Sequence, residues 1–392
     1  MKNFKLLFFF LVIIFLLPFQ TKAADQPQQA QQTGQQNPII VKAKVIEIVS
    51  TGQEQGDNGQ NVPSQDIKVR ILEGSDAGKT VEFTNDYVML KIDDDLYLSE
   101  NPQPDGTVQY SMKDPYRINA IIMFLLIFLV LVWLFGGFQG LRGLVSLFGS
   151  LLLITFVLVP SILHGFSPFI ASFGIAGIII IVGSYITHGF NKTTTVAVIA
   201  MILTVAATAL LTYWAINATY LQGFGDESAL YLNSYGSNAP NIDLVGLLYG
   251  GIMIGLLGVL YDVAISQAIS VEELHKVASH LSRWTIYKRA IRIGREHIGA
   301  LVGTLAIAYI GVSLPLILLY AKTGFPFLVT INQEVFATEI IRILVSSIGL
   351  IIAVPITTLL AIYIVIRKQG ENLDEETIKQ EEEKLEHFNH TH

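Results

Sequence analysis

Long apolar runs separated by short polar connections fill the last two-thirds of the chain. Several of these runs carry no charge over a length near the roughly 20 residues that cross a bilayer as a helix. We predict seven membrane-spanning helices, near residues 118–135, 144–163, 168–187, 194–216, 242–267, 298–320 and 340–366. They make residues 117–366 a transmembrane domain and the chain a polytopic α-helical membrane protein.

The region ahead of these runs has a different pattern. Residues 40–48, 67–72 and 80–83 alternate between apolar and polar positions with a period near two, which is typical of half-buried strands. Clusters of glycine, aspartate and asparagine separate them and indicate turns. We therefore predict that residues 38–116 form a small β-rich domain, either a barrel or an OB-like fold.

The N-terminal residues 1–24 are similar to a secretory signal peptide. Lys2 and Lys5 form a short basic start, and an apolar segment follows from Leu6 to Phe19. The alternative is a retained anchor helix, and both interpretations place the following segment outside the cytoplasm.

Two further segments have biased composition. Residues 25–37 are rich in glutamine and read as a linker without a core, while residues 367–392 read as a solvated acidic tail. The whole chain is 52% hydrophobic and only 15% charged. Soluble domains carry roughly 25% charged residues, so much of this chain must face lipid or protein.

Positive charge near the ends of spans predicts the orientation, because Lys and Arg stay on the cytoplasmic side. The connection at residues 217–241 has no Lys or Arg, whereas residues 270–297 are strongly basic. This bias agrees with the signal segment and predicts a cell-membrane protein with an extracytoplasmic N-terminal domain and a cytoplasmic C-terminus. Residues 270–297 also have the pattern of an interfacial helix that contacts anionic lipids. The alternative is a basic loop that only fixes topology.

One span, residues 242–267, combines glycines with a carboxylate. On a helix, Gly251, Gly255 and Gly258 fall on the same face as Asp262. A glycine groove lets another helix approach closely, which would point Asp262 into that contact. A carboxylate within a span is costly enough to indicate function. The candidate polar residues of this first cluster are Tyr261, Asp262 and Ser266.

A second cluster, Arg295, Glu296 and His297, stands at the start of the next span. Arg295 shares a helical face with Gly299 and Gly303. We therefore hypothesise that the two spans pack through their glycine seams and that Asp262 pairs with Arg295.

A third cluster lies in the last span. Glu339 and Arg342 have the (i, i+3) spacing of a self-neutralising pair, and Ser346, Gly349 and Ala353 continue the same face. A structural role and a transport role are both open for this pair. His188 stands at an inner span end, where it is either simply hydrated or senses protons.

Several kinds of chemistry are not expected. The chain has no cysteine, no zinc-binding HExxH, no Walker lysine and no nucleophile–base arrangement, so we expect neither an enzyme nor a cofactor or metal site. The net charge of −7 does not favour nucleic acid. The expected partners are the lipid bilayer, anionic lipids at residues 270–297, and a homo- or hetero-oligomer.

Three stretches carry a resemblance to a known family. They are Gly258–Ser266, Gly294–Gly299 with Ala306–Pro315, and Glu334 through Gly349 to Pro355. Together with the β-rich region ahead of the first span, they resemble the YibE/F family of bacterial multi-pass membrane proteins. The resemblance implies an integral membrane protein that is often supposed to be a transporter without an established substrate, and it implies no catalytic residues.

These observations favour a transporter or permease, or the membrane subunit of a transport system. Charges surrounded by small residues within the membrane suit a gated pathway. The alternative is a scaffold or accessory protein that binds partners through its β-domain and its basic loop. The substrate, its direction and the energy source are not indicated by the sequence.

Overall fold

The computed structural model describes residues 39–55, 61–103, 107–225, 227–234 and 242–366. The predicted signal segment, the glutamine-rich linker and the acidic tail lie outside the described residues. The chain divides into two compact units, residues 1–135 and 136–392.

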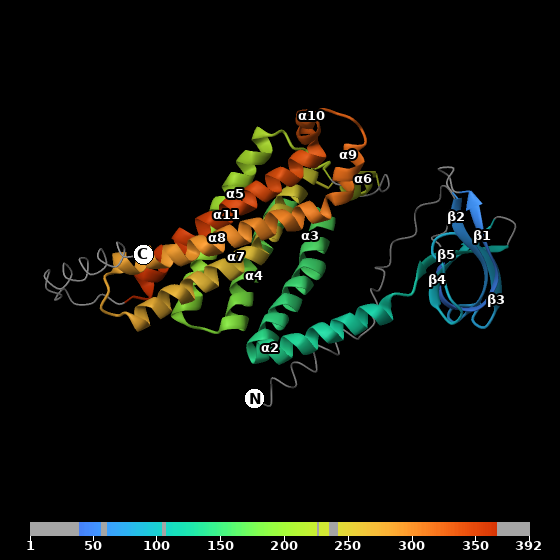
Figure 1. Ribbon diagram of the computed structural model, residues 1–392, viewed down its shortest axis with the longest axis horizontal. Helices are drawn as coiled ribbons and strands as arrows, with labels where there is room; N and C mark the ends of the chain where they lie inside the picture. Colours follow the sequence, from blue (N-terminus) through green and yellow to red (C-terminus); the bar gives the residue numbers. More distant parts are fainter. Residues whose placement is uncertain (1–38, 56–60, 104–106, 226, 235–241, 367–392) are drawn as a thin grey trace, which may run out of the picture. The chain divides into compact units, whose positions relative to one another are not determined.

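The first unit contains a five-stranded antiparallel sheet with the strand order β3-β2-β1-β4-β5. The strands are β1 (Ile39–Gln55), β2 (Asn61–Ile71), β3 (Thr80–Asn85), β4 (Asp95–Pro102) and β5 (Val108–Pro115). The long strand β1 pairs with both β2 and β4, and its register shifts twice against β2. Such irregularities bend a strand. The sheet curls until β3 and β5 approach each other, which forms a half-barrel and confirms the predicted β-domain in this form (Figure 1).

The inside of the half-barrel follows the alternation in the sequence. Its fully buried side chains come from every second position of three strands, and they are Ala43, Val45, Ile67, Val69, Leu96 and Leu98. On its surface, the Tyr110 hydroxyl donates a hydrogen bond of 2.6 Å to Asp76. Lys79 donates one of 2.8 Å to the same carboxylate.

This Tyr110–Asp76 contact predicts how the half-barrel responds to alkali. Burial, and then the hydrogen bond to Asp76, raises the pKa of Tyr110 from 10.0 to about 12. Folding therefore favours the protonated phenol. This stabilisation is complete below pH 10 and is lost as the pH rises from 10 through 12. We expect the melting temperature of the isolated domain 38–116, followed by circular dichroism, to fall across this window. The fall should be smaller in Tyr110→Phe, and equal falls in the two proteins would contradict the prediction.

Acid acts on the other partner of the same contact. Hydrogen bonds from Lys79, and then from Tyr110, lower the pKa of Asp76 below its ordinary value of 3.8. The folded domain therefore favours the ionised carboxylate. This contribution is present above the ordinary value and is lost as the pH falls through the lowered one.

The rest of the described chain is helical. The elements are α2 (Ile118–Leu153), η1 (Ile154–Leu158), α3 (Val159–Leu163), α4 (Pro168–His188), α5 (Lys192–Ala218), α6 (Glu227–Ser234), α7 (Leu244–Val277), α8 (Arg283–Val312), α9 (Leu314–Ala321), α10 (Phe327–Asn332) and α11 (Glu334–Ile364).

The predicted count of seven spans is not confirmed. Five helices among the described residues are long and apolar enough to cross a membrane, or six if α8 and α9 form one broken span. These two helices meet at an angle of 61° just ahead of Pro315, which lacks the N–H that a continuous helix would use. The first apolar run, residues 118–163, counts as one helix of 46 residues. Gly137 interrupts it with φ 54° and ψ −144°, between the first two predicted spans.

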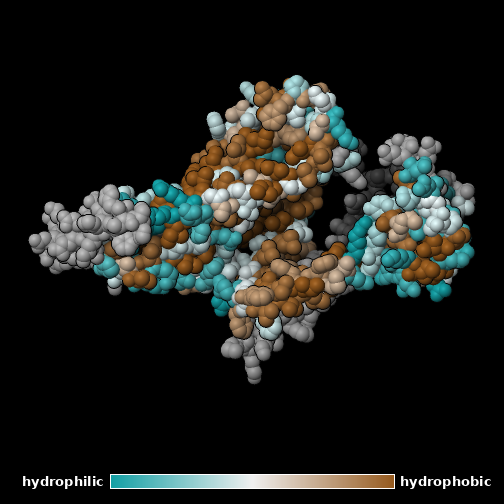
Figure 2. Space-filling model, viewed as in Figure 1, coloured by the Kyte–Doolittle hydropathy of each residue, from teal (hydrophilic) through white to brown (hydrophobic). Residues whose placement is uncertain are grey.

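The second unit is built around α7. This helix packs against α4, α5, α8 and α11, and α11 packs in turn against α5 and α8 (Figure 1). Large apolar side chains also cover the outside of the helices, where they appear brown in Figure 2. Among them, Leu210 and Ile307 are 74% and 72% exposed. An apolar surface of this extent matches a lipid environment better than water.

Candidate functional site

The structure does not place Asp262 in a helix contact. Asp262 is exposed, as are Gly251 and Gly258 on the same face of α7. The opposite face carries Leu256, Leu260 and other bulky side chains, which fill the space toward the neighbouring helices. The predicted stripe is therefore a real face of α7, but its end at Gly258 and Asp262 is exposed.

The other two polar residues of the first cluster bind backbone carbonyls. The Ser266 hydroxyl donates to the Asp262 backbone carbonyl, and the Tyr261 hydroxyl donates to the Gly183 carbonyl at 3.2 Å. Among the described residues, His188 of α4 is the ionisable side chain that lies close enough to act on the Asp262 carboxylate. His188 in turn lies 3.2 Å from the Gln139 amide.

The predicted pair between Asp262 and Arg295 is not formed. Arg295, Glu296 and His297 are all exposed on α8, and the described part of the chain shows no ion pair between Arg295 and Asp262. The adjacent Gly294 is the buried position, so the three residues that directly follow it lie on the exposed side of α8.

The predicted packing of two helices through their glycines is also wrong at most positions. A Cβ built on Gly251, Gly258, Gly299 or Gly303 would meet nothing within 4 Å. Only Gly255 of the predicted five approaches another helix, since its Cβ would lie 2.7 Å from the Tyr309 hydroxyl. The close approaches occur at other glycines: Gly250 meets Ser172, Gly294 meets Val354 and Gly349 meets Thr208.

The third cluster does lie inside the helical unit. Arg342 Nη1 is 3.2 Å from Glu339 Oε1, and these two side chains are only 25% and 23% exposed. The guanidinium carbon lies 5.9 Å from the centre of the Tyr309 ring. Ser346 and Gly349 continue this face of α11 and are buried. The structure thus gathers charge and small polar groups on α11 rather than on α7.

Further buried hydroxyls lie along α5 and α11. On α5, the hydroxyls of Thr204, Thr208 and Thr212 each donate to the carbonyl four residues earlier, at 2.7–2.8 Å. On α11, Thr338, Ser346, Ser347 and Thr357 are buried but have no hydrogen-bond partner among the described residues. An unpaired buried hydroxyl costs about 1–3 kcal/mol. Each of these hydroxyls would therefore gain a hydrogen bond from a polar solute that reached it.

Sequence reasoning missed Gln267, which joins three helices. Its side chain is 1% exposed, and its amide donates to the Ala290 carbonyl of α8 at 2.9 Å and to the Thr358 hydroxyl of α11 at 2.8 Å. The signal was available, because an uncharged polar side chain at the end of an apolar run needs partners when it is buried.

A first cavity, which we name the Arg342 cavity, lies where α7 and α11 begin. It measures about 140 Å³, and its lining includes Gly223, Gly225, Leu248, Gly251, Thr338 and Arg342. The segment that carries Gly223 is fixed to α11, since Glu334 accepts hydrogen bonds of 2.9 Å from the backbone N–H groups of Gln222 and Phe224.

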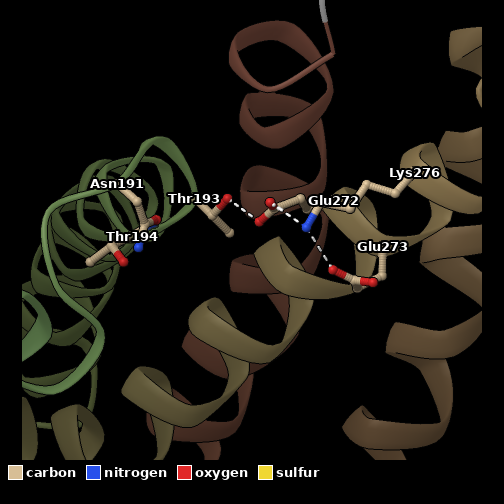
Figure 3. A network of polar contacts seen from close by, with 6 residues as sticks. All are labelled: Asn191, Thr193, Thr194, Glu272, Glu273 and Lys276. Carbon is tan, nitrogen blue, oxygen red and sulfur yellow. Dashed lines mark hydrogen bonds and ion pairs between the residues drawn. The ribbon is translucent and has the colours of Figure 1, made fainter.

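A second cavity, the Glu272 cavity, lies near the other end of α7 and measures about 520 Å³. Figure 3 shows Thr193 reaching from the start of α5 to Glu272 of α7, where its hydroxyl donates to the carboxylate. Lys276 pairs with Glu272 at 2.8 Å and with Glu273 at 2.9 Å. The predicted span ended at residue 267, ten residues before α7 ends, so Lys276 was expected in the separate segment 270–297 rather than on this helix.

The fold and the buried polar side chains first define the general class of protein. A bundle of long apolar helices with a few buried polar side chains is that of a membrane protein, consistent with several passes through the bilayer. The chain belongs to the YibE/F-like protein family, whose model matches residues 124–367. This membership confirms the resemblance seen in the sequence. No curated protein and no solved structure matches the chain.

Proposed function

We propose that this protein is a transporter or permease, or the membrane subunit of a transport system, for a small polar solute. The observation that carries the proposal is the set of unpaired buried hydroxyls distributed along α11, from Thr338 at the Arg342 cavity to Thr357 near the other end of the helix. Polar groups inside a membrane bundle are costly, and they commonly mark a solute pathway. Membership of the YibE/F-like family is compatible with this function but assigns no substrate.

The proposed topology has seven spans. The interruption at Gly137 supports a division of the first apolar run into two spans, and α8 with α9 would form one bent span. In the orientation predicted from charge, the OB-like half-barrel and the Arg342 cavity are extracytoplasmic, and the Glu272 cavity is cytoplasmic. The exposed Lys288, Arg292 and Arg295 of α8 would then meet anionic headgroups.

The proposed pathway is closed in this structure by packing between α11 and its neighbours. Gly349 approaches both Thr208 of α5 and Leu256 of α7, with no room for a side chain between them. Passage of a solute therefore requires these helices to move apart. Transporters achieve such a change by moving one group of helices against another.

The test is solute flux in proteoliposomes of the purified full chain. We would measure radiolabelled acetate, phosphate, glycine and rubidium, and we expect at least one to cross faster than in empty vesicles. Arg342→Gln should reduce that flux about tenfold, equivalent to about 1.4 kcal/mol in the barrier. Thr304→Val is the matched control, because Thr304 is exposed and its hydroxyl only donates to its own helix. Flux equal to that of empty vesicles for every solute would contradict the proposal.

A second candidate is a scaffold that binds a partner through the half-barrel. It is favoured by the exposed apolar side chains of Tyr87, Met89 and Ile92, which are 61%, 48% and 57% exposed on neighbouring positions. Clustered apolar surface of this kind often marks an interaction site. In that case vesicles would show no flux, while the isolated domain would retain a partner.

A further inference from the structure

The lining of the Arg342 cavity contains donors and a cation but, among the described residues, no carboxylate. We propose that this cavity binds a small oxyanion, such as the carboxylate or phosphate group of a solute. As a binding site, the cavity stands on its own geometry. As the entry point for a transported substrate, it rests on the function proposed above.

The orientation of Arg342 determines which of its nitrogens is free for a ligand. Glu339 pairs with Nη1, whereas Nε is buried and has no hydrogen-bond partner among the described residues. A guanidinium can bind a carboxylate or phosphate through two parallel N–H groups, one of them Nε–H. The pair with Glu339 and the Tyr309 ring at 5.9 Å hold the guanidinium in place. Arg342 is thus positioned before any ligand arrives.

Thr338 supplies a second donor one turn earlier on the same face of α11. Its side chain is 3% exposed, and its hydroxyl has no partner among the residues that the structure describes. Gly225 packs directly on it, since a Cβ on Gly225 would lie 2.6 Å from the Thr338 hydroxyl. Thr338 and Arg342 line the same cavity, so an oxyanion there can accept hydrogen bonds from the Arg342 guanidinium and from the Thr338 hydroxyl.

The size of the cavity limits the ligand. An apolar cavity of about 150 Å³ accommodates benzene, which has six non-hydrogen atoms. The Arg342 cavity, at about 140 Å³, therefore suits acetate, phosphate or a similarly small group. Gly251 keeps this space open, because a Cβ there would meet nothing within 4 Å. The phosphate of a lipid headgroup offers the same chemistry, so the experiment has to distinguish a bound lipid from a soluble oxyanion.

The experiment measures the melting temperature of the purified full chain in detergent, with acetate or phosphate replacing chloride at constant ionic strength. Acetamide, which has the shape of acetate without its charge, is the ligand control. We expect acetate or phosphate, but not acetamide, to raise the melting temperature. Arg342→Lys keeps the charge but loses the fork, and it should weaken the apparent affinity about tenfold. If acetate and phosphate changed the melting temperature no more than acetamide does, the proposal would be overturned.

A pair of glycine variants makes the test independent of Arg342. Gly251→Leu would fill the cavity from α7, and we expect it to abolish the response to acetate and phosphate. Gly258→Leu adds the same side chain seven residues later on the same face, at a position that is equally open but does not line the cavity. It should respond as the parent does. Equal responses in the two variants would place the anion elsewhere and overturn the site.

Three further outcomes distinguish this inference from a lipid site and from the proposed function. Stabilisation by phosphatidylglycerol alone, without any response to acetate or phosphate, would identify a lipid site and overturn the soluble ligand. Acetate binding without flux of any solute would support the site and defeat the transport proposal. Flux of a solute by a protein that binds neither anion would leave transport standing and defeat the oxyanion site.

Discussion

Replacing Gly294 with valine is expected to destabilise the helical unit by about 1–3 kcal/mol, the usual cost of overpacking a well-filled core. A Cβ at this position of α8 would collide with Val354 of α11 and would lie 3.0 Å from the Gln267 amide oxygen of α7. Both neighbours are buried, and Gln267 is held by two hydrogen bonds, so neither side chain can move aside cheaply. The measurement is the midpoint of thermal unfolding in detergent, where size-exclusion chromatography after heating gives the fraction of protein that remains folded.

The matched control for this variant is Gly299→Val, five residues later in the same helix. A Cβ on Gly299 would meet nothing within 4 Å, so the change adds the same side chain without a collision. We expect its midpoint to stay near that of the parent. If both variants lost stability equally, the loss would come from placing valine in α8 and not from the contact of three helices at Gly294.

Gly223→Ala is expected to have the second large effect. Gly223 has φ +84°, and its Cβ would collide with the backbone carbonyl of Leu244, where α7 begins. A non-glycine residue in the left-handed region costs about 1–2 kcal/mol, and the backbone collision adds to that cost. Because the same segment borders the Arg342 cavity, we expect lower thermal stability together with faster proteolysis after residue 221.

Gly324→Ala separates the two parts of this cost. Gly324 also has a positive φ, +70°, but nothing lies within 4 Å of a Cβ there. It should therefore lose only the conformational part, about 1–2 kcal/mol. A Gly223→Ala protein no less stable than Gly324→Ala would show that the segment at residue 223 moves away from α7 without cost.

The half-barrel and the helices were readable from the sequence because each has a clear period or length. Alternation of apolar positions identified the strands, and uncharged runs identified the helices. The boundaries of α7 were not readable. It continues from the apolar run through Glu272 and Lys276 to Val277, because charged side chains that pair with one another prolong a helix past its apolar part. Pro315 lay within a predicted span, but its effect on the helix was not anticipated.

The candidate site was only partly predictable for a reason specific to membranes. Periodicity correctly grouped Gly251, Gly258 and Asp262 on one face of α7, but it could not say whether that face points inward. In a soluble protein the apolar face is the buried one, whereas here lipid and protein interior are both apolar. Leu256 and Leu260 on the opposite face take the interior position. For α11 the grouped face is the inner one, and Arg342 and Ser346 therefore lie inside the bundle.

The uninterrupted length of α7 has a mechanical consequence. At 1.5 Å per residue, its 34 residues form a rod of about 51 Å, with Gly251 at one cavity and Glu272 at the other. A stiff rod that pivots near its middle swings its two tips in opposite directions. A tilt of α7 that widens the Arg342 cavity would therefore also move the wall of the Glu272 cavity, so the volumes of the two cavities would change together.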